Sequence, residues 1–198
     1  MTTVYYVTHP DVVVDPDVPV PRWPLSDVGL ARMQRLLEAP WVSGLRSVFC
    51  STEQKALDGA GVLTHHLGIA YTALAELGET DRSSTGFMSR QEFEAVSERF
   101  FAEPDSSVRG WETAADAQRR MVEAVDRVVR RADPAGDTAI VAHGGVGALL
   151  LCSLRGVPIS GDLEQPRRGP EPGTVGGCWF NFDAQSRKLL HGWSPIDL

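Results

Sequence analysis

Two apolar segments of this chain each end at a histidine, so imidazole chemistry is the first that the sequence offers. Tyr5–Thr8 are β-branched or aromatic residues that run into His9, and Ala139–Ala142 run into His143. Each segment predicts a buried parallel strand with an imidazole at its carboxyl end. Because open α/β sheets bind ligands outside the carboxyl ends of their strands, we expect both rings in one pocket. Imidazole can act there as nucleophile, acid or base near neutral pH.

A second set of groups at the same edge favours an anionic ligand. Gly144 follows His143 and opens a predicted helix, whose first N–H groups and dipole attract negative charge. Ser51 follows another predicted strand in the same way, and Lys55 lies one turn into the next helix. Glu76 lies just past a third short strand. Together these groups suit phosphoryl transfer, in which imidazole attacks phosphorus and a carboxylic acid protonates the leaving oxygen.

Alternating strands and helices predict the scaffold that positions these groups. The predicted strands end at Val7, Cys50, Leu74 and His143, and a hairpin follows near the carboxyl terminus. The predicted helices run from the N-cap Ser26 to about Leu37, from Ser51 or Thr52 to about Leu67, from Thr113 to Ala132 and from Gly144 to about Leu154. This order predicts an α/β three-layer sandwich with a mostly parallel sheet, built as a single domain over residues 1–198.

Two further segments are expected to shape the pocket. Residues 77–110 are charged, serine-rich and anchored by phenylalanines, so they predict a small inserted cap that is helical around Arg90–Phe101. A proline-punctuated loop that contains Arg22 joins the first strand to the first helix. Loops at strand tips of such folds commonly carry binding residues. The exposed aromatic residues of the cap are compatible with a lid or with a homodimer.

Composition excludes several classes of function. The net charge of −7, with no stripe of lysine or arginine, argues against a nucleic-acid partner. The apolar stretch Ala139–Leu154 is too short and too interrupted to span a membrane. Cysteines occur at three widely spaced positions with no C-x-x-C pair, and no secretory leader is visible, so we expect reduced thiols and a cytoplasmic location.

The order of these motifs resembles the histidine phosphatase superfamily, also called phosphoglycerate-mutase-like proteins, nearly from end to end. Members of that family end the first strand in Arg-His-Gly, where this chain has Thr8-His9-Pro10. The other segments that resemble family motifs are Leu25-Ser26-Asp27-Val28-Gly29, Cys50-Ser51-Thr52-Glu53-Gln54-Lys55-Ala56, Leu74-Ala75-Glu76, Trp111-Glu112-Thr113 and Val141-Ala142-His143-Gly144-Gly145. Each motif alone is weak, whereas six in this order and spacing are specific.

The resemblance implies a role for each matching residue. His9 would be the nucleophile that becomes phosphorylated, and His143 would donate to the phosphoryl oxygens. Glu76 would be the general acid and then the base for water, and Lys55 would replace the family's second phosphate-binding arginine. No metal or other cofactor is implied. The carboxylates that a different register would bring to the site are Glu79 and Asp81.

Three departures from the family pattern weaken the expected phosphate site. Thr8 offers one neutral hydroxyl where arginine offers a charged, bidentate fork. Lys55 also lacks bidentate geometry, and Pro10 removes a backbone N–H that glycine would provide. Losses of this kind are worth about two or more decades in rate. Arg22 and Arg82 are the candidates to supply the missing charge.

The resemblance therefore implies a metal-independent phosphatase that hydrolyses phosphomonoesters through a phosphohistidine on His9. Its partner would be a phosphorylated small molecule or a phosphoprotein. A phosphomutase is less favoured, because no extra basic cluster is present to hold a second phosphate. The alternative is a degenerate member that binds a phosphorylated ligand without turnover, which Thr8 and Lys55 suggest. A specialised reaction is also open, in which the missing arginine makes room for a bulky group.

Other enzyme classes that use similar motifs are not supported. A His-Gly-Gly segment also occurs in the oxyanion loops of α/β-hydrolases, but this chain has no G-x-S-x-G nucleophile motif. It also lacks a P-loop and the G-x-G-x-x-G pattern of dinucleotide-binding domains.

Overall fold

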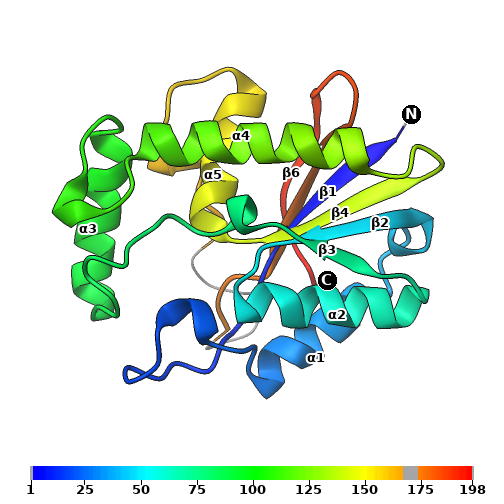
Figure 1. Cartoon of the computed structure of the whole chain (residues 1–198), viewed down its shortest axis with the longest axis horizontal. Coiled ribbons are helices and arrows are strands. Elements are labelled where there is room, and N and C mark those ends of the chain that lie inside the picture. The colour runs from blue at the N-terminus through cyan, green and yellow to red at the C-terminus, as the bar shows by residue number, and fades with distance from the viewer. Residues whose placement is uncertain (1, 167–173, 198) are drawn as a thin grey trace.

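Both histidine strands lie in the middle of one sheet. The computed structural model describes residues 2–166 and 174–197, and within them six strands follow the order β3-β2-β4-β1-β5-β6 (Figure 1). The strands are β1 (Thr3–Thr8), β2 (Leu45–Cys50), β3 (Tyr71–Ala73), β4 (Asp137–Ala142), β5 (Cys178–Asp183) and β6 (Leu189–Pro195). The first four in the sheet are parallel, and β5 and β6 are antiparallel. The predicted α/β architecture with a mostly parallel sheet is thus confirmed.

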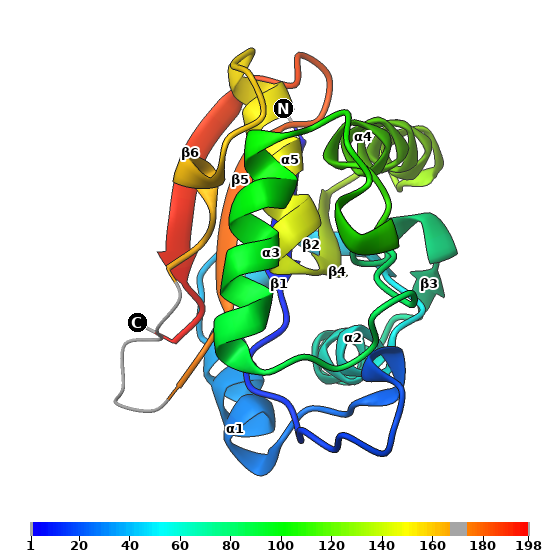
Figure 2. The same ribbon diagram turned by 90° about the vertical axis from the view of Figure 1, so that its left-hand side faces the viewer.

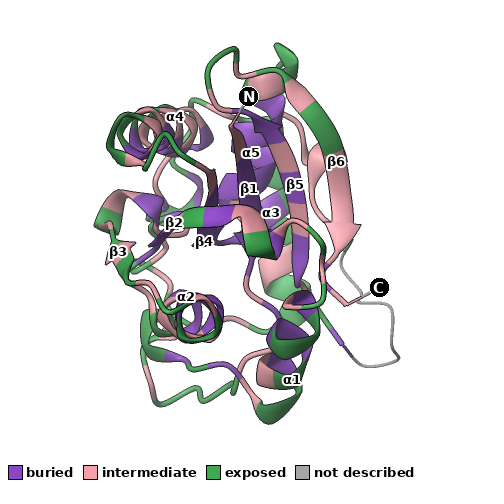
Figure 3. Cartoon of the chain, turned by 90° about the vertical axis from the view of Figure 1, so that its right-hand side faces the viewer, coloured by how far each residue is buried: buried purple, intermediate pink, exposed green. Residues whose placement is uncertain are grey.

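Helices cover both faces of the sheet, which gives the three layers. The helices α1 (Asp27–Leu36) and α2 (Gln54–Leu67) pack on one face, and α4 (Ala114–Arg131) and α5 (Gly144–Arg155) on the other. Figure 3 shows the central strands as buried and the outward faces of these helices as exposed. The short 3-10 helices are η1 (Val20–Arg22), η2 (Val42–Gly44), η3 (Ala75–Leu77), η4 (Val108–Gly110) and η5 (Gly161–Leu163). Among the described residues, none of the helices is both long enough and apolar enough to cross a membrane.

Alternation along β1 assigns its residues to two cores. Tyr5 and Val7 belong to the core beneath α1 and α2, whereas Val4 and Tyr6 belong to the core beneath α4 and α5. Successive side chains of a strand point to opposite faces, so a strand buried on both faces must be apolar throughout. This is why β1 carries a continuous apolar run, and why its polar chemistry begins only at its carboxyl end.

Local capping largely follows the sequence prediction, with one difference. Ser26 caps α1 by accepting the N–H of Gly29, and Gly68 ends α2 in the left-handed conformation with φ 68°. Neither Ser51 nor Thr52 caps α2, because the helix begins one residue later, with Glu53 at the N-cap. The Ser51 hydroxyl instead accepts the N–H of Glu53, which shapes the turn between β2 and α2.

The segment over residues 77–110 carries α3 (Arg90–Ala102), as predicted. Ser89 and Glu92 form a capping box at its start, each side chain accepting the other's backbone N–H. Phe100 and Phe101 are buried in the core that α4 and α5 also share. Figure 2 shows α3 in front of the carboxyl ends of the parallel strands, where the predicted cap would lie.

A buried arginine joins four parts of the chain near these strand ends. Arg32 on α1 is 1% exposed, and its guanidinium lies 2.8 Å from carboxylate oxygens of both Asp11 and Asp197. It also donates to the carbonyls of Val175 and Gly176, which lead into β5. Removing one partner of a buried ion pair leaves the other charges uncompensated, which is strongly destabilising.

We therefore expect Arg32→Met to lower the free energy of unfolding by about 3 kcal/mol. Denaturation in urea, followed by circular dichroism, measures this change. Arg99→Met is the matched control, because Arg99 is exposed and pairs with Glu103, the C-cap residue of its own helix. Its free energy of unfolding should stay close to that of the wild type, because solvent screens an exposed ion pair. Equal losses in the two variants would show that the buried network does not stabilise the fold.

Candidate active site

The parallel pairing of β1 with β4 brings the two histidines together. Thr8 is in register with Ala142, and the N–H of His9 donates to the Ala142 carbonyl over 3.1 Å. The next residue after each strand is a histidine, and the centroids of the two rings are 5.3 Å apart at an interplanar angle of 66°. The two imidazoles expected at neighbouring strand tips therefore lie side by side, but only His9 lines the cavity described below, whereas the His143 side chain is fully buried.

The His9 ring is held with one defined nitrogen available. Its Nδ1 lies 2.9 Å from the Pro10 carbonyl, which can only accept a hydrogen bond. Burial, with smaller contributions from the nearby His143 and Lys55, lowers the His9 pKa to about 3 against the opposing effects of the Pro10 carbonyl and Glu53. The ring is thus neutral near pH 7, with its proton on Nδ1 and an unshared pair on Nε2. An imidazole in that state is a nucleophile.

His143 is fully buried at the N-cap of α5. Its backbone carbonyl accepts a hydrogen bond from the Tyr6 hydroxyl at 2.9 Å, which fixes the backbone where β4 enters the helix. Its ring Nε2 lies 3.4 Å from Oε1 of Glu53. Burial lowers the His143 pKa more than the Glu53 carboxylate raises it, so this ring is also neutral.

Glu53 is a site residue that the sequence analysis did not select. One of its oxygens lies 2.6 Å from Nζ of Lys55, and the other accepts the N–H of Glu79. Burial alone would raise the Glu53 pKa, but His143, Lys55 and this hydrogen bond together lower it to about 2. The carboxylate is therefore ionised and neutralises the lysine that was expected to face phosphate. Lys55 also donates to the Val20 carbonyl.

The structure places Glu76 away from the histidines. Its carboxylate pairs with Arg127 of α4 at 3.0 Å, and both side chains are partly exposed to solvent. Glu79, three residues on, is the carboxylate that reaches the site. The sequence held a signal for this outcome, because Leu77-Gly78-Glu79 repeats the Leu-x-Glu pattern of Leu74-Ala75-Glu76.

Glu79 is fixed at the amino end of α5. Its two oxygens accept the N–H groups of Gly145 and Val146 at 3.1 and 3.0 Å. A Cβ on residue 145 would lie 2.8 Å from Oε1, so the glycine leaves room for the carboxylate in this position. Arg120 of α4 holds the loop below by donating to the carbonyls of residues 76 and 78 at 2.8 and 3.0 Å.

The remaining predicted phosphate-binding residues divide into two groups. Gly144 and Arg82 line the same cavity as His9. The Arg82 guanidinium lies over the Phe93 ring, 4.8 Å from its centroid. Ser51 is buried beneath the site, where it supports the backbone of Glu53. Arg22 is exposed on η1 and does not line the cavity.

Thr8 lies beneath the cavity and is fully buried. Its Oγ1 accepts the Cys178 N–H at 2.9 Å and lies 2.6 Å from Oε1 of Gln165, a residue that the sequence analysis did not select. The hydroxyl therefore faces the protein interior and Gln165 rather than open space. No sequence signal links these two positions, because they are 157 residues apart.

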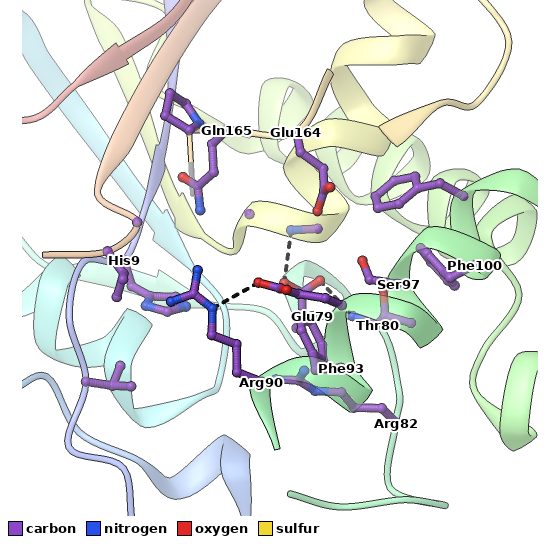
Figure 4. Close-up of a pocket in the computed structure, with 18 of the residues that line it drawn as sticks. His9, Glu79, Thr80, Arg82, Arg90, Phe93, Ser97, Phe100, Glu164 and Gln165 are labelled. Carbon is purple, nitrogen blue, oxygen red and sulfur yellow. Dashed lines mark hydrogen bonds and ion pairs between the residues drawn. The ribbon is translucent and has the colours of Figure 1, made fainter. Parts of the chain in front are cut away.

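The cavity beside His9 is about 380 Å³ and lies between the strand ends and α3 (Figure 4). One wall holds His9, Gly144 and Glu79, and the opposite wall is aromatic, with Phe93, Phe100 and Trp111 among its residues. Arg90 reaches over the opening beside His9 and pairs with Glu94. A second cavity, of about 670 Å³, lies against the proline-rich loop and shares Glu79 and Arg82 with the first. Volumes of this size accommodate small molecules.

The described residues provide neither a reactive thiol nor a cluster of metal ligands. All three cysteines are free and buried, and burial raises the pKa of Cys50 to about 12 and that of Cys178 to about 11. These thiols are therefore protonated and unreactive. Within residues 2–166 and 174–197, no group of three or more His, Cys, Asp or Glu side chains is placed to hold a metal ion.

The lowered His9 pKa predicts that acid destabilises the fold. Between pH 6.5 and about 3 the unfolded histidine binds a proton that the folded one does not, so the free energy of unfolding falls as pH falls. The slope approaches about 1.4 kcal/mol per pH unit for one histidine. Urea denaturation at pH 7.5 and pH 5 measures it, and His9→Gln should be less sensitive to pH. An unchanged pH dependence in that variant would contradict the prediction.

Comparison with known proteins identifies the family of this chain. A family model described as histidine phosphatase superfamily (branch 1) matches residues 18–167, a range that begins after Thr8-His9-Pro10. No curated protein matches the sequence significantly.

Solved structures share the fold at low sequence identity. A mycobacterial glucosyl-3-phosphoglycerate phosphatase in complex with inorganic phosphate has a TM-score of 0.77 at 18% identity, over 100% of both chains. YhfR of Bacillus stearothermophilus has a TM-score of 0.73 at 21% identity, over 98% of this chain and 96% of its own. A putative α-ribazole-5′-P phosphatase of Escherichia coli has a TM-score of 0.70 at 18% identity, with the same coverage. Since the family model spans most of the sequence, this chain belongs to the histidine phosphatase superfamily, branch 1.

Proposed function

We propose that this protein is a phosphatase that hydrolyses small phosphomonoesters through a phosphohistidine on His9. The observation that carries the proposal is the state of the His9 ring. Its Nδ1 is committed to the Pro10 carbonyl, which leaves the Nε2 electron pair free in a cavity that also holds the amino end of α5. A neutral nucleophile beside a group of anion-binding N–H donors is the arrangement that phosphoryl transfer needs.

In the first step, the Nε2 electron pair of His9 attacks phosphorus and the bond to the ester oxygen breaks. The proton that neutralises the leaving oxygen comes from the Glu79 carboxyl group, which then carries the negative charge. Glu79 suits this role because it lines the cavity with His9 and is held in place by α5. The phosphoryl oxygens bind at the amino end of α5, where they compete with the Glu79 oxygens for the N–H groups of Gly145 and Val146.

In the second step, the Glu79 carboxylate takes a proton from water and the water oxygen attacks phosphorus. The P–N bond breaks and its electron pair returns to Nε2, so both residues regain their starting states. Through both steps the anionic phosphoryl group competes with Glu53 for Lys55 and for the His143 ring. This competition explains how a site that is neutral at rest can still bind a dianion.

The size and the lining of the cavity favour a small substrate with an apolar leaving group. Its volume of about 380 Å³ fits a small molecule, and Phe93, Phe100 and Trp111 offer apolar surface opposite the histidine. Arg82 and Arg90 lie at the same cavity and can contact polar or anionic substituents of the ester. No residue in these two steps requires a metal ion to act, so the proposed reaction is metal-independent.

The test is hydrolysis of p-nitrophenyl phosphate by the wild-type protein between about pH 4.5 and 8 with EDTA present. Samples quenched in alkali, where a phosphohistidine survives, are digested and analysed by mass spectrometry. Turnover that resists EDTA, with phosphate found on the peptide that contains His9, is the expected result. Turnover with no labelled peptide would overturn the phosphohistidine route. Binding of inorganic phosphate without any turnover would instead identify a degenerate phosphate-binding protein.

A further inference from the structure

We propose that Gln165 binds the phosphoryl oxygens of the substrate and so takes over the task of the arginine that Thr8 replaces. The inference rests on the proposed phosphatase function and adds a binding residue to it. Gln165 follows η5, far in sequence from both histidines, yet its side chain lies in the His9 cavity with Gly144 (Figure 4). A side-chain amide has two N–H donors and is a suitable ligand for a developing oxyanion.

Thr8 determines which end of this amide faces the cavity. The Thr8 hydroxyl accepts the N–H of Cys178 and has its own proton to donate. Its Oγ1 lies 2.6 Å from the Gln165 side chain, a distance typical of O–H···O and short for N–H···O, so the partner is the amide oxygen. The Cys178 carbonyl, at 3.2 Å, is the weaker alternative acceptor. With Oε1 committed to Thr8, the Nε2 donors point away from it.

The Nε2 group lies over the amino end of α5. A Cβ on Gly144 would overlap Nε2 of Gln165, so glycine at this position makes room for the amide. A Cβ on Gly176, just beside the His9 carbonyl, would lie 3.7 Å from the same nitrogen. The amide donors therefore lie beside the first residue of α5, in the cavity that His9 also lines. A phosphoryl group bound at the helix end would meet both sets of donors.

The same contacts explain why Thr8 and Gln165 belong together. Thr8 is fully buried, so its hydroxyl does not reach substrate, and it acts as a positioning residue for Gln165. An arginine at position 8 would project into the volume that the Gln165 amide occupies. In this chain the neutral Gln165 amide thus replaces the charged guanidinium of the family arginine. The Glu53–Lys55 ion pair also keeps the net charge of the site close to zero.

The experiment compares the wild-type protein with Gln165→Ala, Thr8→Val, Thr8→Ser and the Gln165→Ala/Thr8→Val double variant. Rates are measured with p-nitrophenyl phosphate, and affinity is measured with inorganic phosphate as a competitor and by the rise in melting temperature. We expect Gln165→Ala to lower kcat/KM by about 10²-fold and to weaken phosphate binding. Gln185→Ala is the matched control, because Gln185 is exposed in the turn between β5 and β6. It should behave as wild type.

The Thr8 variants separate positioning from general stability. If Thr8 acts through Gln165, Thr8→Ser should retain activity, and Thr8→Val should add little to the loss already caused by Gln165→Ala. Full activity in Gln165→Ala overturns the inference even when the wild type is a phosphatase. If the wild-type protein binds phosphate without turnover, the inference is tested by affinity alone: Gln165→Ala should bind inorganic phosphate more weakly than the wild type, and equal affinity overturns the inference. A wild-type protein that neither turns over nor binds phosphate overturns both proposals.

Discussion

His9→Gln is expected to abolish phosphatase activity, lowering kcat by about 10⁴-fold or more. Glutamine has a similar length and can keep a hydrogen bond to the Pro10 carbonyl, but its amide nitrogen has no free electron pair for phosphorus. With no P–N bond to form, the reaction loses the covalent route that divides one difficult displacement into two easier ones. The measurement is steady-state hydrolysis of p-nitrophenyl phosphate at saturating substrate.

Loss of activity alone does not separate a missing nucleophile from a damaged site, so His9→Gln is paired with two further measurements. Inorganic phosphate should still raise the melting temperature of the variant, because the donors at the start of α5 remain. No phosphorylated peptide should be found. His191→Gln is the control, since His191 is exposed on β6 and stacks on Trp179. A His9→Gln protein that retains turnover would exclude the phosphohistidine mechanism.

The positions of the two histidines could be predicted from sequence because short-range rules determine them. Each follows a continuous apolar run, which predicts a buried parallel strand, and glycine after His143 marks the start of a helix. In the same way, Ser26 correctly predicted the start of α1 and Gly68 the end of α2. Pairing of β1 with β4 then makes neighbours of residues 134 positions apart. The sequence did not show that β1 and β4 are neighbours in the sheet, and this became known only from the structure.

The carboxylate could not be assigned from sequence for a local reason. Leu-x-Glu occurs twice in succession, and a single 3-10 turn, η3, decides which glutamate faces the histidines. That turn directs Glu76 toward Arg127 on α4, and the chain then reaches the amino end of α5 only at Glu79. A pattern of three residues carries no information about such a turn, so the sequence favoured Glu76 although the fold brings Glu79 to the cavity.

The electrostatics of the site depended on contacts that spacing does not reveal. Lys55 was expected to offer its charge to phosphate, but Glu53, two residues before it, lies 2.6 Å away and neutralises it. Gln165 reaches the site from the region after α5, through a hydrogen bond to Thr8 that spans most of the chain. The partner of Lys55 thus lies within its own motif, whereas the partner of Thr8 lies 157 residues away, where a search limited to the motifs cannot find it.

The assignment of Glu79 as the proton donor predicts a loss of about 10² to 10⁴-fold in kcat for Glu79→Gln. The amide keeps the shape of the side chain and can still accept an N–H from α5 through its oxygen, but it cannot release a proton to the leaving group. The loss should grow with the basicity of that group, because a poor leaving oxygen depends more on protonation. Hydrolysis rates for p-nitrophenyl phosphate and for an alkyl phosphate measure this trend.

Glu76→Gln provides the matched control, because the two glutamates are three residues apart on the same loop. Its carboxylate pairs with Arg127 at the surface, so the variant should lose little stability and no activity. If Glu76→Gln instead showed the loss that depends on the leaving group, the proton donor would be the carboxylate implied by the family motif, and the loop would have to rearrange when substrate binds. Equal loss for both esters in Glu79→Gln would mean that Glu79 holds α5 in place and transfers no proton.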